Sequence, residues 1–88
     1  MAVSGRLYSG TKTVTTAVTL DTTAPAVREV LVQADPTNTQ NLLIGSSATS
    51  TPIVLRASEA ITMPCMSTQL IFVAAASGTQ TVNWLARE

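Results

Sequence analysis

The densest group of side chains that could do chemistry lies between residues 35 and 41. Asp35, Thr37, Asn38 and Asn41 could offer oxygen ligands to a calcium ion. That ion takes about six to eight oxygens, however, and only one ligand here would be a carboxylate. An aspartate before a proline also caps the backbone of a tight turn, and this accounts for the same residues. The sequence favours the turn, so no metal site is predicted.

The wider chain lacks the groups that ordinary catalysis needs. It has no histidine, which removes the commonest general base and the usual partner of a nucleophile. The lone Lys12 does not follow a glycine-rich phosphate loop. The single cysteine, Cys65, cannot form an intramolecular disulfide and is predicted to be a small buried core group. We therefore expect no enzyme activity, no cofactor and no small-molecule substrate.

The composition of the chain argues against nucleic acids and membranes as partners. Five basic and five acidic residues give zero net charge, and they are scattered without the basic stripe that a nucleic-acid binder needs. No apolar run approaches the roughly 18 residues of a membrane span, and the start of the chain lacks the pattern of a secretory signal. Charged residues make up only 11% of the chain, and serine and threonine are abundant. These hydroxyls suit a surface that packs against protein, or they reflect the preference of threonine for strands.

The elements that position these groups are predicted to be strands. Apolar and polar residues alternate with period two, as in half-buried strands, and turn residues recur about every 8–12 positions. The run from Leu70 to Ala75 is continuously apolar and is predicted to be a central strand with Phe72 in the core. The other expected strands are Lys12–Leu20, Val27–Ala34, Asn41–Gly45, Ile53–Arg56, Ala60–Pro64 and Thr79–Arg87.

Seven or eight such strands predict one all-β domain, an antiparallel β-sandwich (jelly-roll-like) or a small barrel. Residues 1–11 are expected to be an N-terminal arm or a short first strand, and residues 12–88 the sandwich. Period-two patterns do not encode strand order. Residues 46–52, between two of the strands, are predicted to be a flexible polar loop.

The two remaining aromatic residues, Tyr8 and Trp84, are candidates for contacts with other proteins. Trp84 is the only tryptophan, and it is either a core plug or an interface anchor near the C-terminus. Tyr8, in the expected arm, is a candidate for a contact between subunits. Tyr8, Phe72 and Trp84 are too few and too scattered to be a platform for stacked bases.

From Leu31 onward the chain resembles a recurring pattern in small structural proteins of tailed-phage virions. The similar segments are ADPTNTQNLLIG, the Ser/Thr loop, IVLRASEAITMP and LIFVAAASGTQTVNWLARE. Two positions depart from the pattern. Gln40 stands where it often has glycine, and Ala57–Ser58–Glu59 stands where it has Pro-Gly-Glu.

The resemblance implies a virion component, made in the host cytoplasm and located on the capsid surface. We expect a capsid decoration (cement) protein that binds the major capsid protein, stabilises the shell and forms a homo-oligomer, a dimer or trimer. The alternative is a tail- or head-fibre module that binds a receptor or glycan. No nucleic acid, membrane or small-molecule partner is expected. The candidate interface residues are Tyr8, Lys12, Asp35, Asn38, Ser46, Ser47, Thr49 and Trp84.

Overall fold

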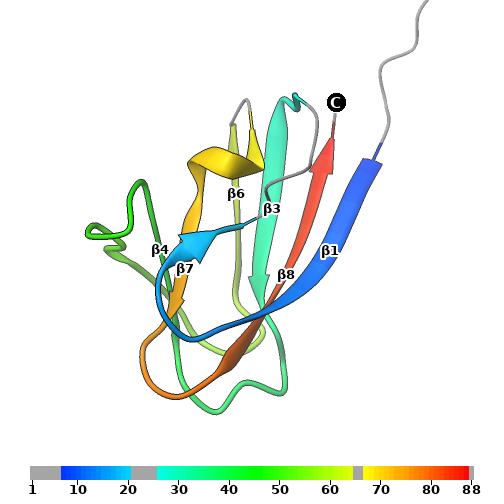
Figure 1. Cartoon of the computed structure of the whole chain (residues 1–88). Helices are drawn as coiled ribbons and strands as arrows, with labels where there is room; N and C mark the ends of the chain where they lie inside the picture. The colour runs from blue at the N-terminus through cyan, green and yellow to red at the C-terminus, as the bar shows by residue number, and fades with distance from the viewer. Residues whose placement is uncertain (1–6, 21–25, 65–66, 88) are drawn as a thin grey trace, which may run out of the picture.

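The computed structural model describes residues 7–20, 26–64 and 67–87. They form eight strands in two four-stranded antiparallel sheets, and no α-helix occurs among them (Figure 1). The predicted all-β sandwich is therefore confirmed. The elements are β1 (Leu7–Val14), β2 (Val18–Thr19), β3 (Glu29–Ala34), β4 (Leu42–Gly45), β5 (Ile53–Leu55), β6 (Ala60–Pro64), a 3-10 turn η1 (Thr68–Leu70), β7 (Phe72–Ala75) and β8 (Gln80–Arg87).

Strand order follows a simple nested rule. The first sheet, sheet A, has the order β1-β8-β3-β6, and the second, sheet B, has the order β2-β7-β4-β5. Four of the antiparallel pairs are thus β1 with β8, β2 with β7, β3 with β6 and β4 with β5. These are the pairs that one long hairpin would make if its tip were the β4–β5 connection. Wrapping that hairpin across two layers brings β8 beside β3 and β7 beside β4.

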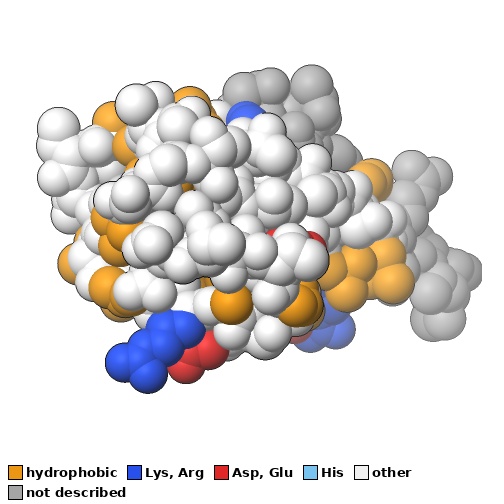
Figure 2. Space-filling view, turned by 90° about the horizontal axis from the view of Figure 1, so that it is seen from below, with side chains coloured by type: hydrophobic (Ala, Val, Ile, Leu, Met, Phe, Trp, Pro, Cys, Tyr) orange, Lys and Arg blue, Asp and Glu red, His pale blue; other side chains and the backbone are white. Residues whose placement is uncertain are grey.

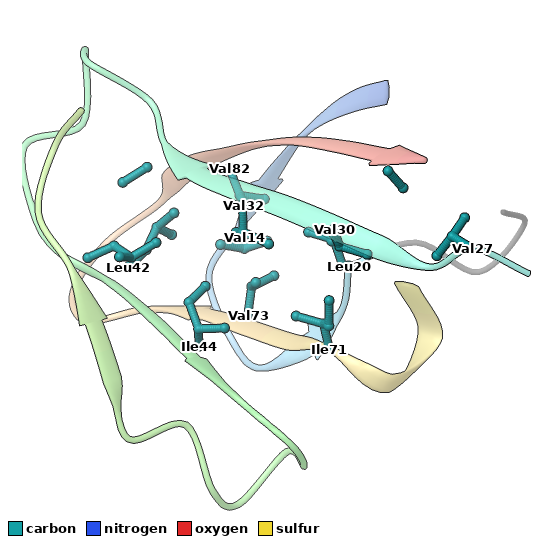
Figure 3. Close-up of a cluster of buried hydrophobic side chains, with 13 residues drawn as sticks. Val14, Leu20, Val27, Val30, Val32, Leu42, Ile44, Ile71, Val73 and Val82 are labelled. Carbon is teal, nitrogen blue, oxygen red and sulfur yellow. The ribbon is translucent and has the colours of Figure 1, made fainter. Parts of the chain in front are cut away.

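The core fills the space between the two sheets. Side chains alternate across each strand, so in β3 the buried positions are Val30, Val32 and Ala34, while Glu29, Leu31 and Gln33 lie on the outer face. The same alternation supplies Val82 and Ala86 from β8. Figure 3 shows that the valines among them, Val30, Val32 and Val82, face Leu42, Ile44, Ile71 and Val73 of the other layer.

The connections β1–β2, β3–β4, β5–β6 and β7–β8 gather at one end of the sandwich, at the bottom of Figure 1. Backbone hydrogen bonds link them there: the Ala75 amide donates to the Thr15 carbonyl, and the Ala76 amide to the Asn41 carbonyl. We call this the loop end. Its longest segment is residues 35–41, between β3 and β4.

The first predicted strand is divided in two by the structure. Lys12–Leu20 was expected to be continuous, but β1 ends at Val14 and the chain crosses to sheet B before β2 begins. Thr16, which a continuous strand would place on the same face as Val14 and Leu20, is exposed in this corner. Val14 and Leu20 are both buried, but they enter the core from different layers. Because the alternation of buried and exposed residues has the same phase before and after the corner, the sequence pattern could not reveal that the strand is broken.

The apolar run Leu70–Ala75 also differs in detail. β7 is a central strand of sheet B, as predicted, but it begins at Phe72 because residues 68–70 form a 3-10 turn. Leu70 is exposed at the end of that turn. Phe72 is half-buried and is not part of the core cluster, so its prediction as a core residue is wrong. The alternation places it on the opposite face from Ile71 and Val73.

Some expectations concern residues outside the described part. Cys65 lies there, as do residues 1–6 of the expected arm. Residues 7–11 belong to β1, which pairs with β8 along its whole length from Leu7 to Val14. β1 therefore runs across residue 12, where the sandwich was expected to begin.

The turn between β5 and β6 holds one residue in an unusual backbone conformation. The Glu59 amide donates to the Arg56 carbonyl at 2.9 Å, closing a β-turn with Ser58 in its third position. Ser58 has φ of 73°, the only positive φ among the described residues other than glycine. A type II turn requires this and usually has glycine there.

We predict that Ser58→Gly stabilises the protein by about 0.5–1 kcal/mol, because glycine avoids the steric penalty of the left-handed region. Denaturant unfolding measures the change. Ser46→Gly is the matched control: Ser46 is exposed and lacks a positive φ, so this change should be destabilising. Equal effects of the two substitutions would contradict the explanation.

Candidate functional site

Asp35, the carboxylate of the polar cluster, is occupied by donors from its own surroundings. Its Oδ2 accepts the Thr37 amide at 3.0 Å and the Thr37 hydroxyl, and its Oδ1 accepts Asn83 Nδ2 at 2.8 Å. These hydrogen bonds, that of the Thr37 hydroxyl above all, lower the pKa of the Asp35 carboxyl below its ordinary value. The predicted turn is confirmed, since the Asn38 amide donates to the Asp35 carbonyl at 3.0 Å.

Asn38 extends the β8 ladder with its side chain. Its Nδ2 donates to the Thr81 carbonyl and its Oδ1 accepts the Thr81 amide, both at 2.8 Å. The side-chain amide therefore pairs with the backbone of β8 as another strand would. This fixes the 35–41 loop to the start of the last strand.

Gln80, on β8, also binds the 35–41 loop, here through its own side chain. Its side chain is buried, with Oε1 accepting the amides of Thr39 at 3.0 Å and Gln40 at 3.2 Å. Its Nε2 donates to the Ser77 carbonyl at 3.0 Å. One glutamine thus ties the 35–41 loop and the 76–79 turn together.

These groups form a network that we call the amide staple: Asp35, Asn38, Gln80 and Asn83. The sequence pointed to the first two and missed the other two. The burial of Gln80 could have been predicted from the sequence. In the alternation of the last strand it lies on the same, inward face as Val82, Trp84 and Ala86. A polar side chain in an apolar phase needs buried partners. Since the staple uses its polar atoms within the chain, it holds the loop end in shape.

The predicted Ser/Thr contact loop follows β4, whereas the 35–41 loop precedes it, so the two loops lie at opposite ends of this strand. Ser46, Ser47 and Thr49 belong to residues 46–52, the tip of the nested hairpin. The loop folds back on itself: the Ser46 amide donates to the Ser50 carbonyl and the Ser50 amide to the Ser47 carbonyl, both at 3.1 Å. A Cβ at Gly45 would lie 1.8 Å from the Ser50 carbonyl oxygen. The tip is therefore a closed turn, and it lies apart from Asp35 and Asn38.

The remaining predicted contact residues lie on β1 and β8. Tyr8 and Trp84 are half-buried and pack against the core, which favours the core reading of Trp84. Trp84 lies directly opposite Gly10, whose missing side chain leaves room for the indole. Lys12 Nζ donates to the Thr19 carbonyl at 3.1 Å and so bridges the two sheets.

The outer face of sheet A carries a shallow apolar trough that the sequence did not single out. One hollow of about 190 Å³ is lined by Leu7, Glu29, Leu31, Thr62, Leu85 and Arg87. A second, of about 170 Å³, shares Leu31 and Leu85 with the first and continues it towards Gln33 and Asn83. Leu7 is 63% exposed and Leu85 39%. The trough is open to solvent and more apolar than polar along its walls.

The two charged residues that line the trough, Glu29 and Arg87, form an ion pair. Arg87 Nε lies 3.1 Å from Glu29 Oε1 in an exposed ion pair, which contributes about 0–1 kcal/mol. At the loop end, most of the visible surface is uncharged polar atoms and backbone, with few charged side chains (Figure 2). Both surfaces are suited to uncharged protein contacts.

Other kinds of site find no support in the described ranges. Residues 7–20, 26–64 and 67–87 contain no group of three or more metal-ligating acidic or cysteine side chains. No helix within these ranges is long and apolar enough to cross a membrane. Comparison of the chain with models of protein families, with curated proteins and with solved structures gave no match.

Gln80→Met should lower the free energy of unfolding by about 1–3 kcal/mol, because it leaves the Thr39 and Gln40 amides without their acceptor. Chemical denaturation measures it. The control is Gln40→Met, at a neighbouring exposed side chain, which should change stability by no more than about 0.5 kcal/mol. If both variants behaved alike, the staple would have no energetic role.

Asp35 should make stability depend on pH. Its folded-state pKa is lowered, so its contribution is complete above the ordinary value of 3.8, declines as pH falls below it and is lost once pH passes the lowered pKa. Asp35→Asn should therefore be destabilising near neutral pH, with the difference from wild type shrinking in acid. Urea titrations across this range measure the trend. A difference independent of pH would contradict the role of the charge.

Proposed function

We propose that this protein is a capsid decoration protein of a tailed phage, one that docks on the outside of the head and stabilises the shell. The observation that carries the proposal furthest is the apolar trough on the outer face of sheet A. It is a ready contact surface on a molecule whose polar side chains at the loop end are already engaged. Its occupant would be the major capsid protein.

The strand order supports the same reading. Nested pairs in the order β1-β8-β3-β6 over β2-β7-β4-β5 are those expected of a jelly roll, in which a long hairpin is rolled into two Greek keys. Viral capsid domains use this architecture, although a fold alone does not assign a function. The resemblance from Leu31 onward points in the same direction.

Decoration of a shell needs little affinity from each copy. An ordered lattice presents many identical sites, and linked copies gain effective concentration without new contacts. A shallow trough with Leu31 and Leu85 at its centre suits such weak, repeated docking. The exposed Glu29–Arg87 pair at its rim would help to orient the contact while adding little affinity.

The alternative, a fibre module that binds a glycan, loses its best candidates. Sugar-binding sites commonly present exposed aromatic faces, but Tyr8 and Trp84 are half-buried against the core and Phe72 is half-buried on sheet B. Trp84 contributes to the second hollow of the trough, but most of that lining is not aromatic. A saturable signal on a glycan array would favour this alternative.

The test is occupancy of the head. Cryo-electron microscopy of virions that carry the gene should show the chain on the shell, and purified protein should rebind heads that lack it. Leu85→Ser should lower rebinding roughly tenfold, since it removes the apolar centre of the trough. Leu70→Ser is the matched control, because Leu70 is 54% exposed on the 3-10 turn and does not line the trough. Density on the tail alone, or equal loss in both variants, would contradict the proposal.

A further inference from the structure

The four edge strands of the sandwich are unequally protected. At the edges of sheet B, β2 has two residues and β5 has three. At one edge of sheet A, β6 has five residues and ends in Pro64. The other edge is β1, with eight residues and no proline. Short strands and prolines are the usual ways of preventing an edge from pairing with another chain, and β1 has neither.

The backbone groups that β1 presents outward can be identified from its neighbours. The Asp35 amide donates to the Thr81 carbonyl, so Thr81 and every second residue after it bond towards β3. The residues between them, including Val82 and Trp84, bond towards β1, and their partners there are Lys12 and Gly10. The backbone groups that face away from β8 are therefore those of Leu7, Ser9, Thr11 and Thr13.

Within the described part of the chain, these outward groups have no backbone partner. Their side chains lie on the outer face and three of them are hydroxyls, so none brings charge to the edge. A lysine on an edge strand often prevents pairing with another chain. Lys12 is the one charged residue of β1, but its side chain lies on the inner face and donates to the Thr19 carbonyl at 3.1 Å. The edge is long, uncharged and open.

We propose that β1 pairs with β1 of a second copy of this chain, antiparallel, about a twofold axis at Gly10. This places Leu7 opposite Thr13 and Ser9 opposite Thr11, so all the outward groups find partners in both copies. On the inner face Tyr8 meets Lys12 of the other copy, and the two lysines are never opposed. A shift of the axis to Ser9 or Thr11 would leave outward groups unpaired.

Trp84 adds a second reason for Gly10 to lie on the axis. A Cβ at Gly10 would come within 2.8 Å of the indole, so the ring leans over this glycine towards the edge. Two copies would place their half-buried indoles on either side of the Gly10 pair and cover them further. Aromatic side chains that cover a glycine in a neighbouring strand are a known way to stabilise such a site.

The pairing closes on itself. Each copy uses its β1 edge once, and the edge left over on each side is β6. In β6 the Ala34–Glu59 bond shows that Ile61 and Met63 bond towards β3, so the nitrogen of Pro64 faces outward and has no hydrogen to donate. The product is therefore a dimer with one continuous eight-stranded sheet and not a fibre.

The experiment compares two proline variants by sedimentation equilibrium of the full chain. Wild type should have twice the monomer mass. Ser9→Pro removes no hydrogen bond within a monomer but removes one from each side of the dimer, so the dissociation constant should rise on the order of 100-fold. Thr62→Pro is the control, because Thr62 faces outward on the β6 edge, and it should stay dimeric.

Amide hydrogen exchange of the wild type tests the interface without relying on a variant. The amides of Ser9 and Thr11 should be protected at high concentration and lose protection on dilution, and Trp84 fluorescence should shift to the red in step. A wild-type monomer, a trimer, or a dimer in which these amides exchange freely would overturn the proposal. The result is independent of head binding: a dimer that fails to bind heads contradicts only the proposed function, and a monomer that binds them contradicts only the dimer.

Discussion

The whole sandwich depends on the last strand, β8, lying between β1 and β3. It pairs with both along its length, and it supplies Val82 and Ala86 to the core. Gln80 at its start secures the 35–41 loop, and Trp84 covers Gly10 on β1. Without β8, sheet A would keep only the β3–β6 pair, and β1 would have no neighbouring strand in the sheet. The core, the loop end and the trough all follow from the position of this strand.

This arrangement separates the tasks of the polar and apolar surfaces. The amide groups at the loop end satisfy backbone donors and acceptors that strands leave at their ends, and this keeps a long connection ordered. The outer face of sheet A keeps an apolar surface because Leu31 and Leu85 occupy outward positions among polar residues of β3 and β8. The many serine and threonine residues therefore have two roles. Some lie on the exposed faces of strands, and others form turns such as the closed tip at residues 46–52.

Much of the fold was predictable because burial in a half-exposed strand has period two. The boundaries of β6 and the alternation of β8 came directly from that pattern, and the Asp35 turn came from aspartate and proline chemistry. Strand order did not, since alternation is the same whichever strand lies alongside. The corner at residues 15–17 and the 3-10 turn at residues 68–70 were missed because neither interrupts the hydrophobic pattern. Of the staple, Asn83 was invisible in sequence, because an outward amide on a strand has no need of a partner until a loop folds over it.

Nested pairing also sets the order in which the chain can fold. β4 and β5 are joined by the shortest loop of the four nested pairs, whereas β1 and β8 are separated by most of the chain, and the entropy of closing a loop rises with its length. Pairing is therefore cheapest at the tip and spreads outward through β3 with β6 and β2 with β7. During synthesis β1 emerges before the other seven strands and waits longest for its partner, so both of its edges are exposed until β8 has been made. The strand with the most open edge in the finished molecule is also the one that stays unpaired longest while the molecule is being built.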